Sequence, residues 1–407
     1  MEKRKGGMSE IAKAGMLMPK ESMLEIQKHD KSLYIGIPKE TSFEENRISL
    51  VPDSVALLIN NGHEVVLESG AGTAANFTDA EYNEAGARIV YSKEDVFQAD
   101  IILKVAPPSD EEIALLKTKQ NLLSILQVNT QSDKFFKQLS SKKVTAIAFD
   151  YIKDRSNMYP IIQSMSEIAG GASLLIAAEY LSNNMHGRGE MLGGISGIPP
   201  SEVVIIGAGT VGEFAARTAL GLGAEVKVFD NSLYKLRRLQ NHLGARLYTS
   251  IIVPETLSKA LMTADVAIGA MSPSDGLSPC VVSEEMVSRM RSGSVIVDVS
   301  IDSGGCFATS SVTNHTNPTF IKYGVIHYCV PNIASRVART ASYALSNVFT
   351  PILLNMGQEG GFESLLWADD GVRHGVYMYK GIVTNKIISD RFKLPFKDID
   401  LFNMSRM

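Results

Sequence analysis

The sequence predicts an α/β protein with two doubly wound, Rossmann-like domains that are joined by two long helices and separated by a cleft. Three observations lead to this prediction. The chain has 407 residues, which is too many for a single hydrophobic core. Short β-branched strand patterns alternate with helical patterns, as is typical of parallel sheets. A glycine-rich turn near residue 207 then opens a second series of strands and helices.

Composition narrows the class of protein. Hydrophobic residues make up 45% and charged residues 21%, the net charge is −4 and the pI is about 6.0, so no basic surface for nucleic acid is expected. We see no apolar run of the roughly 18–20 residues that span a bilayer, and we expect no membrane segment. Three cysteines without CxxC spacing (Cys280, Cys306 and Cys329) fit a reducing cytoplasm better than a disulfide framework or a zinc site.

The first β/α series follows an extension of 30 residues. Residues 1–30 are rich in Met and Lys and have no signal-peptide core, so we expect a flexible extension. Helical patterns begin at Val51 and Thr78, the first of them closed by Gly62. Strand patterns alternate with these helices and occupy residues 32–40, 63–70, 86–90, 99–108, 121–129 and 143–152.

The second series begins after a long helix. Residues 164–183 form a helical pattern with an Ala/Gly-rich face, and a glycine-rich loop leads from it to strand patterns within residues 202–332. A second long helix is expected over residues 334–356. We therefore predict one domain from residues 31–160 and 335–407, and another from residues 161–334 that includes the connecting helix. The cleft between them is the expected ligand site.

A dinucleotide-binding pattern stands at the start of the second series. The strand "VVII" is followed by Gly207, Gly209 and Gly212, and then by a helix. The first glycine permits a tight turn, the second lets the pyrophosphate approach the backbone, and the third lets helix and strand pack closely. Asp230 ends the next strand and would accept a hydrogen bond from the adenosine ribose. Since it would also repel a 2′-phosphate, the pattern favours NAD over NADP.

Motifs along most of the chain resemble one family. "GIPKE…ENRISLVP", "GHEVVLESGAG", "DIILKV", "MSEIAG", "VVIIGAGTVG" and "VIVDVSIDSGGC" stand in the order and spacing of the alanine dehydrogenases, a group that includes the NAD-binding first domain of proton-translocating nicotinamide nucleotide transhydrogenase. The resemblance covers residues 34 to about 400. It implies reversible, NAD-dependent oxidation of a small amino acid to a 2-oxo acid and ammonium, by a homo-oligomer that in this family is a hexamer.

The resemblance also implies roles for individual residues. Arg47 matches the arginine that binds the substrate carboxylate, although from the residues alone it is only a charge in a loop. Lys104 matches a second substrate-binding cation, and a lysine closing a buried strand is unusual in itself. Asp302 matches a catalytic-loop aspartate that contacts both the nicotinamide ribose and the substrate. Asn332 matches an asparagine beside the nicotinamide and the substrate.

Two further residues match cofactor contacts in the family, although both residue types are also common at caps and surfaces. These are Ser166, in "MSEIAG", and Lys235, five residues after Asp230.

The sequence departs from the family at the residue expected to exchange protons. The family has a histidine there, in sequence similar to "FLHLA", whereas the aligned stretch here is "SILQVNT" and the residue is Gln127. Glutamine does not exchange a proton near neutral pH, while histidine is suited to do so. Since general acid–base catalysis contributes roughly 10²–10⁴-fold, the change could remove most of the chemistry. Lys104 and Asp302 then become the proton-transfer candidates, with Gln127 orienting substrate or water.

Smaller departures lie nearby. Residues 105–108 read "VAPP" where the family has "VKEP", and Ala334 and Ala338 replace prolines. Arg336, at the start of the second long helix, is interpreted either as a substrate contact or, in preference, as a surface charge.

Two alternatives to an amino-acid dehydrogenase stay open. One is a transhydrogenase-type domain that passes hydride to a partner, although its loop resembles "AAQNGG" where this chain has "SIDSGG". The other is a catalytically impaired NAD-binding protein with a sensing role, an alternative that rests on Gln127.

Overall fold

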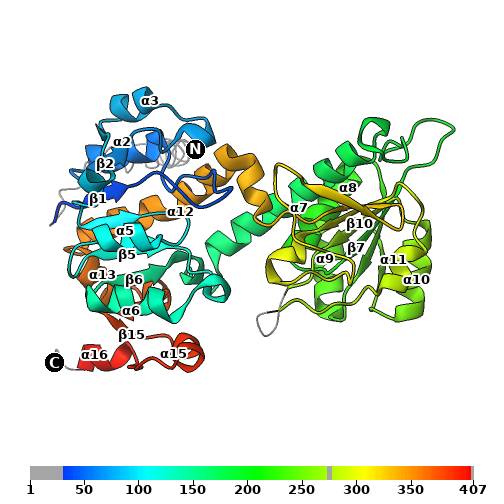
Figure 1. The fold of residues 1–407 in the computed structure, drawn as a ribbon. Coiled ribbons are helices and arrows are strands. Elements are labelled where there is room, and N and C mark those ends of the chain that lie inside the picture. The colour runs from blue at the N-terminus through cyan, green and yellow to red at the C-terminus, as the bar shows by residue number, and fades with distance from the viewer. Residues whose placement is uncertain (1–30, 273–276, 405–407) are drawn as a thin grey trace, which may run out of the picture.

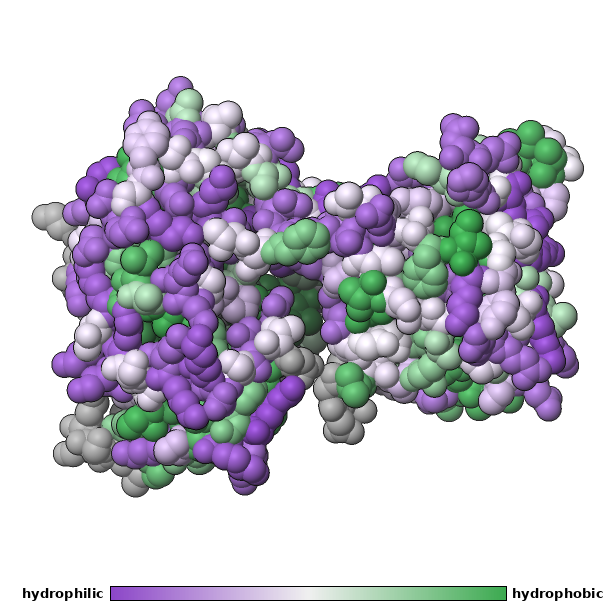
Figure 2. All heavy atoms as spheres, viewed as in Figure 1, coloured by the Kyte–Doolittle hydropathy of each residue, from purple (hydrophilic) through white to green (hydrophobic). Residues whose placement is uncertain are grey.

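A computed structural model describes residues 31–272 and 277–404, and shows two β-sheets connected by two long helices, α7 (Pro160–Tyr180) and α12 (Ala338–Gln358) (Figure 1). Both sheets are mainly parallel and carry helices on both faces, which confirms the predicted fold class. The extension expected over residues 1–30 lies outside the described residues. Figure 2 shows that the surface is deeply notched between the two lobes.

The first sheet has eight strands in the order β15-β14-β6-β5-β4-β1-β2-β3. Strands β1 to β6 are parallel, and β14 and β15 add an antiparallel edge from the C-terminal part of the chain. The strands are β1 (Tyr34–Ile37), β2 (Glu64–Glu68), β3 (Arg88–Val90), β4 (Ile101–Leu103), β5 (Asn121–Ser124), β6 (Thr145–Ala148), β14 (Val376–Tyr379) and β15 (Ile382–Val383).

Helices cover this sheet and bury its apolar side chains in two clusters, one on each face. The long helix α12 packs against the face that carries Ile35 and Leu103. The remaining helices are α2 (Pro52–Asn60), α3 (Asp79–Glu84), α4 (Lys93–Val96), α5 (Asp110–Leu115), α6 (Asp133–Ser141), α13 (Phe362–Ala368), α14 (Asp370–His374), α15 (Lys386–Phe392) and α16 (Asp400–Met404), with 3₁₀ turns η1 (Thr73–Ala75), η2 (Val128–Thr130) and η3 (Phe149–Tyr151).

The second sheet has seven strands in the order β12-β13-β11-β10-β7-β8-β9, of which only β12 is antiparallel. Its elements are β7 (Glu202–Ile206), β8 (Glu225–Phe229), β9 (Tyr248–Ser250), β10 (Val266–Gly269), β11 (Val295–Asp298), β12 (Thr319–Lys322), β13 (Val325–Tyr328), α8 (Thr210–Gly221), α9 (Leu233–Leu243), α10 (Pro254–Thr263), α11 (Glu284–Ser288), η4 (Asn183–Met185), η5 (Val299–Ser303) and η6 (Ile333–Val337).

The strand orders place a topological switch point in each sheet. In the first sheet β1 lies between β2 and β4, and in the second β7 lies between β8 and β10, so consecutive connections turn to opposite sides at these positions. Ligands of doubly wound sheets bind outside the carboxyl ends of the strands at such points. The segments that follow β1, β4, β7 and β10 are therefore the expected positions of the site.

Helix α7 corrects the expectation that no segment is apolar and long enough to span a bilayer. Within the described residues it is the one helix that meets that test of length and composition, with a mean hydropathy of 1.4 over its best window. It packs closely on α8 through its small residues, since a Cβ at Gly170 would lie 2.4 Å from the carbonyl oxygen of Val211. Helix α7 thus connects the two sheets and packs against the second.

Strand β5 is shorter than the sequence predicted. The apolar pattern continues to Leu126, but the strand ends at Ser124. The cause lies in its neighbours, because Leu123 pairs with Leu103 at the end of β4 and Ser124 pairs with Ala148 at the end of β6. Beyond these positions the N–H of Ile125 still donates to the carbonyl oxygen of Val105 at 3.0 Å, and the chain then turns away from the sheet.

Candidate active site

The glycine-rich turn after β7 has the geometry that a dinucleotide needs. A Cβ at Gly207, where φ is +113°, would lie 2.2 Å from the carbonyl oxygen of Ala270, and one at Gly212 would lie 1.9 Å from that of Gly207. Only glycine is tolerated at these two positions. At Gly209 the nearest atom to an added Cβ is Ser272 Oγ at 3.7 Å, so this side of the turn is open. Helix α8 begins at the next residue, where unpaired N–H groups favour a phosphate.

Asp230 lies directly after β8 and binds the same turn. Its Oδ2 accepts a hydrogen bond from the N–H of Ala208 at 2.8 Å, and its Oδ1 accepts one from the N–H of Ser232 at 2.7 Å. The carboxylate is therefore held in place beside the glycine-rich turn, with lone pairs left for a ribose hydroxyl. Lys235 lies in the first turn of α9, close to this carboxylate in sequence. These residues fit the adenosine half of NAD.

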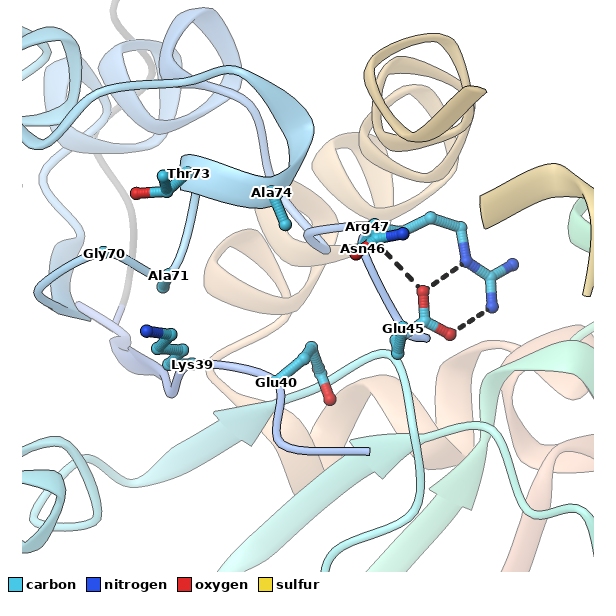
Figure 3. A pocket seen from close by; sticks show the side chains of 9 residues that line it. All are labelled: Lys39, Glu40, Glu45, Asn46, Arg47, Gly70, Ala71, Thr73 and Ala74. Atoms are coloured by element: carbon cyan, nitrogen blue, oxygen red, sulfur yellow. Dashed lines mark hydrogen bonds and ion pairs between the residues drawn. The ribbon is translucent and has the colours of Figure 1, made fainter. Parts of the chain in front are cut away.

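Arg47 lies at the carboxyl edge of the first sheet and forms a bidentate pair with Glu45. The Nε–Oε1 distance is 2.7 Å and the Nη2–Oε2 distance is 2.6 Å, with both side chains buried (Figure 3). Burial lowers the pKa of Arg47, but the charge and hydrogen bonds of Glu45 together with the charges of Glu40 and Asp302 outweigh it and raise the pKa, so the guanidinium stays charged. Its Nη1 also contacts Met165 Sδ of α7 at 3.4 Å, next to the partly buried Ser166.

Asp302 and Asn332 reach Arg47 from the second sheet. The Nδ2 of Asn332 donates to Glu45 Oε2 at 3.1 Å, and the backbone N–H of Asn332 donates to Asp302 Oδ1 at 3.0 Å. Asp302 is accessible to solvent on one side and crowded by protein on the others. This crowding raises the pKa of its carboxyl, and the Asn332 N–H and the charge of Arg47 offset part of the rise. Groups from both sheets thus meet in one cluster.

Lys104 follows β4 directly and is fully buried. Its Nζ lies 3.1 Å from Glu40 Oε2 and 3.1 Å from Glu112 Oε1. Burial alone would lower the pKa of Lys104. The charges and hydrogen bonds of Glu40 and Glu112 outweigh this effect and raise the pKa, so the amine stays protonated. This pairing disfavours Lys104 as a proton acceptor and suits it to the role of a fixed positive charge.

Gln127 is in a turn, three residues beyond the end of β5. Its backbone is left-handed, with φ +47° and ψ +54°, and it precedes η2. The side chain is exposed to solvent. Gln127 thus lies at the carboxyl edge of the sheet, as the sequence predicted, but in a surface turn and not in the strand.

A cavity of about 220 Å³ lies beside Arg47 at the ends of β1 and β2, as Figure 3 shows. Gln127 does not line it. The lining residues are Lys39, Glu40, Glu45, Asn46, Arg47, Gly70, Ala71, Thr73 and Ala74.

Sequence reasoning missed the acidic partners in this region. Glu40, Glu45 and Glu112 each pair with a cation of the site, and only the short spacing of Glu45 and Arg47 was visible in the sequence. His315 was also missed, although its backbone N–H donates to Glu44 Oε1 at 2.5 Å near the junction of the two sheets. Burial lowers the pKa of His315.

Arg336 has a structural role. Its Nη2 lies 2.8 Å from Glu179 Oε2 of α7, so it ties η6 to that helix. This contact agrees with its interpretation as a charge outside the site.

Two doubly wound sheets, a glycine-rich turn that opens a helix and a charged cluster shared by both halves define a two-domain α/β protein of the dinucleotide-binding type. The chain belongs to the alanine dehydrogenase/PNT family. Residues 36–169 match the family model "Alanine dehydrogenase/PNT, N-terminal domain", and residues 173–386 match "Alanine dehydrogenase/PNT, C-terminal domain". The resemblance seen in the motifs is thereby confirmed.

Individual relatives agree with this assignment. The chain is 36% identical to alanine dehydrogenase 2 of Staphylococcus aureus (strain USA300) over 367 residues, which are 90% of this chain and 98% of the relative. A solved L-alanine dehydrogenase superposes with a TM-score of 0.83 at 36% identity and covers 88% of this chain and 99% of its own. The transhydrogenase from Sinorhizobium meliloti, with a TM-score of 0.74 at 24% identity and coverage of 87% and 99%, shares the fold.

Proposed function

We propose that the protein catalyses the reversible, NAD-dependent oxidative deamination of a small L-amino acid such as alanine to a 2-oxo acid and ammonium. Family membership and the intact glycine-rich turn support the cofactor, and the cationic groups at the edge of the first sheet support an amino-acid substrate. NAD supplies the hydride acceptor when it is bound. The remaining chemistry falls to the side chains of the chain itself.

The observation that carries this proposal is the cluster that joins the two sheets. Arg47 is linked through Glu45 to Asn332, and through Asn332 to Asp302. A substrate bound there would lie between the first sheet and the proposed nicotinamide position of the second. Hydride transfer requires this placement, since reacting atoms must come within about 3–3.5 Å of each other.

Glu45 binds the guanidinium of Arg47 in the way that a substrate carboxylate would. Its two oxygens accept hydrogen bonds from Nε and Nη2 in the fork geometry that arginine offers to any carboxylate. Binding of an amino-acid carboxylate to this fork therefore requires Glu45 to move away from Arg47, or to share the N–H groups of Arg47 with the substrate carboxylate. Lys104 would contribute a second fixed positive charge, and Asp302 and Asn332 would orient the amino group and the cofactor.

A decisive experiment measures NADH formation from NAD with a panel of small L-amino acids. We expect turnover with at least one of them, and a fall in kcat/KM of roughly 10²-fold or more in Arg47→Leu, because a charge-assisted bidentate contact is lost. Arg289→Leu is the matched control, since it removes an exposed guanidinium from the residue that directly follows α11. Asp302→Asn should abolish turnover while NADH binding, followed by its fluorescence, persists.

The same assay separates the alternatives. Binding of NADH with no turnover of any amino acid would favour the sensing role. Hydride transfer only to a second nicotinamide on an added partner would favour the transhydrogenase type. Equal turnover in wild type and Arg47→Leu would contradict the proposal that Arg47 binds the substrate carboxylate.

A further inference from the structure

The loop that carries Arg47 is held from the opposite side of the cleft. It connects β1 to α2 in the first lobe, and Arg47 lies near its end. Three of its residues, Glu44 to Asn46, form hydrogen bonds with residues that lie 271 to 291 positions further along the chain. These partners follow the catalytic loop η5 or the last parallel strand of the second sheet, β13. The loop is therefore a point of contact between the two lobes that Figure 2 shows on either side of the notch.

Glu44 makes this contact with both its side chain and its backbone. Its Oε1 accepts a hydrogen bond from the backbone N–H of His315 at 2.5 Å, and its carbonyl oxygen accepts one from Ser335 Oγ at 2.6 Å. The same hydroxyl oxygen accepts a hydrogen bond from the N–H of Asn46 at 2.9 Å. Hydrogen bonds to a carboxylate are roughly twice as strong as those between neutral groups. The bond from His315 to Glu44 is therefore the main polar attachment of this part of the loop.

The segment that carries His315 is fixed to the second sheet. The N–H of Thr313 donates to the carbonyl oxygen of Cys329, which directly follows β13, at 3.0 Å. The Oγ1 of Thr313 donates to the carbonyl oxygen of Pro318 at 3.0 Å, which closes the segment on itself. Glu44 thus binds a part of the second lobe that moves with its sheet.

The backbone of the loop supports a functional reading of this contact. Glu44 has φ +60°, in the left-handed region that glutamate rarely adopts. Left-handed residues other than glycine cluster at functional sites, where the surrounding structure holds them in place. On the other side of the contact Asn332 is also left-handed, with φ +54°, and its Nδ2 donates to Glu45 Oε2 at 3.1 Å. An unfavourable backbone at Glu44 is thus retained at the point where the lobes meet.

These contacts limit the movement of the two lobes. The chain passes between the lobes in α7 and α12, so opening of the cleft is a rotation about these helices. Such a rotation would have to break the hydrogen bonds of Glu44 to His315 and of Glu45 to Asn332. The loop positions Arg47, and the proposed nicotinamide position belongs to the second lobe. The distance between substrate and cofactor therefore depends on these bonds.

We infer that Glu44 is a positioning residue for hydride transfer, because its bond to the His315 N–H holds the Arg47 loop against the second lobe at the distance that the reaction needs. This inference rests on the proposed amino-acid oxidation. Glu44 does not line the cavity beside Arg47 and acts through the two residues that do, Glu45 and Arg47. A misplacement of about 1 Å can cost roughly 10²-fold in rate, so one lost contact is sufficient for a measurable effect.

The test compares two amides at this position, Glu44→Gln and Glu44→Asn. Both remove the charge, and they differ by one methylene, about 1.5 Å of reach. Glutamine can still accept the His315 N–H, whereas asparagine cannot reach it, although asparagine suits the left-handed backbone better and should fold at least as well. With L-alanine and NAD, Glu44→Asn should lower kcat by roughly 10–10²-fold, and Glu44→Gln by about threefold or less.

Two further measurements distinguish positioning from a general loss of structure. The affinity for NADH, followed by its fluorescence, should stay within about twofold in both variants, because the glycine-rich turn of the second sheet is unchanged. Glu64→Asn removes an exposed carboxylate at the start of β2, at the amino edge of the first sheet, and should match wild type in kcat.

A readout independent of turnover is hydrogen exchange in the protein without substrate. The segment of residues 313–318 should exchange faster in Glu44→Asn than in wild type, with Glu44→Gln close to wild type, because the N–H of His315 loses its acceptor only in the asparagine variant. Equal exchange in the three proteins would contradict the contact on which the inference depends.

The outcomes separate this inference from the proposed function. If wild type oxidises alanine and the two amide variants have equal kcat, the positioning role of Glu44 is overturned. A parallel loss of NADH affinity in both variants would also contradict it, because Glu44 would then support the fold of the second lobe. If wild type oxidises no amino acid, the proposed function fails and the positioning role fails with it, whereas the exchange measurement still decides whether Glu44 joins the lobes.

Discussion

The ligand edges of the two sheets are built from different parts of the chain. At the second sheet, backbone geometry makes the candidate cofactor site, with Gly207 and Gly212 fixed by close approach and Gly209 left open. At the first sheet, charged side chains make the site, and Arg47 and Lys104 are already paired with carboxylates. The comparison teaches that a backbone site tolerates much sequence change around it, whereas a side-chain site can change its chemistry through one substitution such as Gln127.

The paired lysine gives the largest expected effect. Lys104→Met leaves Glu40 and Glu112 buried without their shared cation, so the free energy of unfolding should fall by about 3–5 kcal/mol. Lys93→Met removes a part-exposed cation that also contacts Glu112, and it should lower stability by less than about 1 kcal/mol. Urea unfolding at neutral pH measures both. Equal effects of the two variants would show that the buried pairing does not stabilise this edge.

Two aspartates, the part-exposed Asp150 and the buried Asp298, should respond to amidation with opposite signs. The pKa of Asp150 is raised from 3.8 to about 7, so the folded protein binds this proton more tightly than the unfolded chain. This group therefore lowers stability as the pH rises from about 4 to about 7, and its full effect persists above that range. Asp150→Asn should stabilise the protein by up to about 4 kcal/mol at pH 8 and have little effect at pH 4.

Asp298 at the second sheet is the matched comparison. Its carboxylate accepts hydrogen bonds from Ser300 N, Cys306 N and Ser310 Oγ at 3.0, 3.0 and 2.7 Å. Burial raises the pKa of Asp298 as well, but Asp298→Asn should still destabilise the protein by about 1–3 kcal/mol, because an amide nitrogen would face one of the three hydrogen-bond donors. Thermal unfolding at the two pH values measures both variants. Destabilisation by Asp150→Asn at pH 8 would contradict the raised pKa of Asp150.

The acid–base substitution comes next in size. Gln127→His should raise the turnover of alanine by about 10²-fold and add a pH limb near 6.5, because histidine exchanges protons in that range. Histidine also tolerates the left-handed backbone of this turn. Gln98→His, at an exposed position on the opposite edge of the sheet, serves as the control. An unchanged rate in Gln127→His, on a measurable basal turnover, would show that this turn does not face the reacting atoms.

The open glycine gives the smallest effect. Gly209→Ala should weaken NADH binding by about tenfold or more with no loss of stability, because the added methyl has ordinary space in the protein but points to the expected pyrophosphate position. Gly221→Ala, at the far end of α8 and with no atom within 4 Å of the added Cβ, should leave binding unchanged. Fluorescence titration with NADH measures the affinity of both variants. Equal affinities of Gly209→Ala and Gly221→Ala would contradict cofactor binding at this turn.

Much of the fold could be predicted from the sequence because its signals are local. Strand patterns, helix caps such as Thr78 and the glycines of the nucleotide turn each depend on residues a few positions apart. The end of β5 could not be predicted in this way, because it depends on where β4 and β6 stop.

The side-chain pairs of the candidate site could not be predicted from the sequence either. Lys104 and Glu40 lie 64 residues apart in the sequence and meet only because β1 and β4 are neighbours. The sequence places Asp150 within a strand pattern, and nothing in the sequence shows that this carboxyl lacks a cation among the described residues of the folded protein. The family pattern supplied the candidate positions, and the fold then determined the charge state and the partners of each group.

The most direct measurement is the product balance of the wild-type protein with L-alanine and NAD. Oxidative deamination predicts that NADH and ammonium form in equal amounts, at a rate that saturates with alanine and falls in Arg47→Leu. NADH that binds to the protein, with neither NADH nor ammonium produced from any small amino acid, would contradict the account.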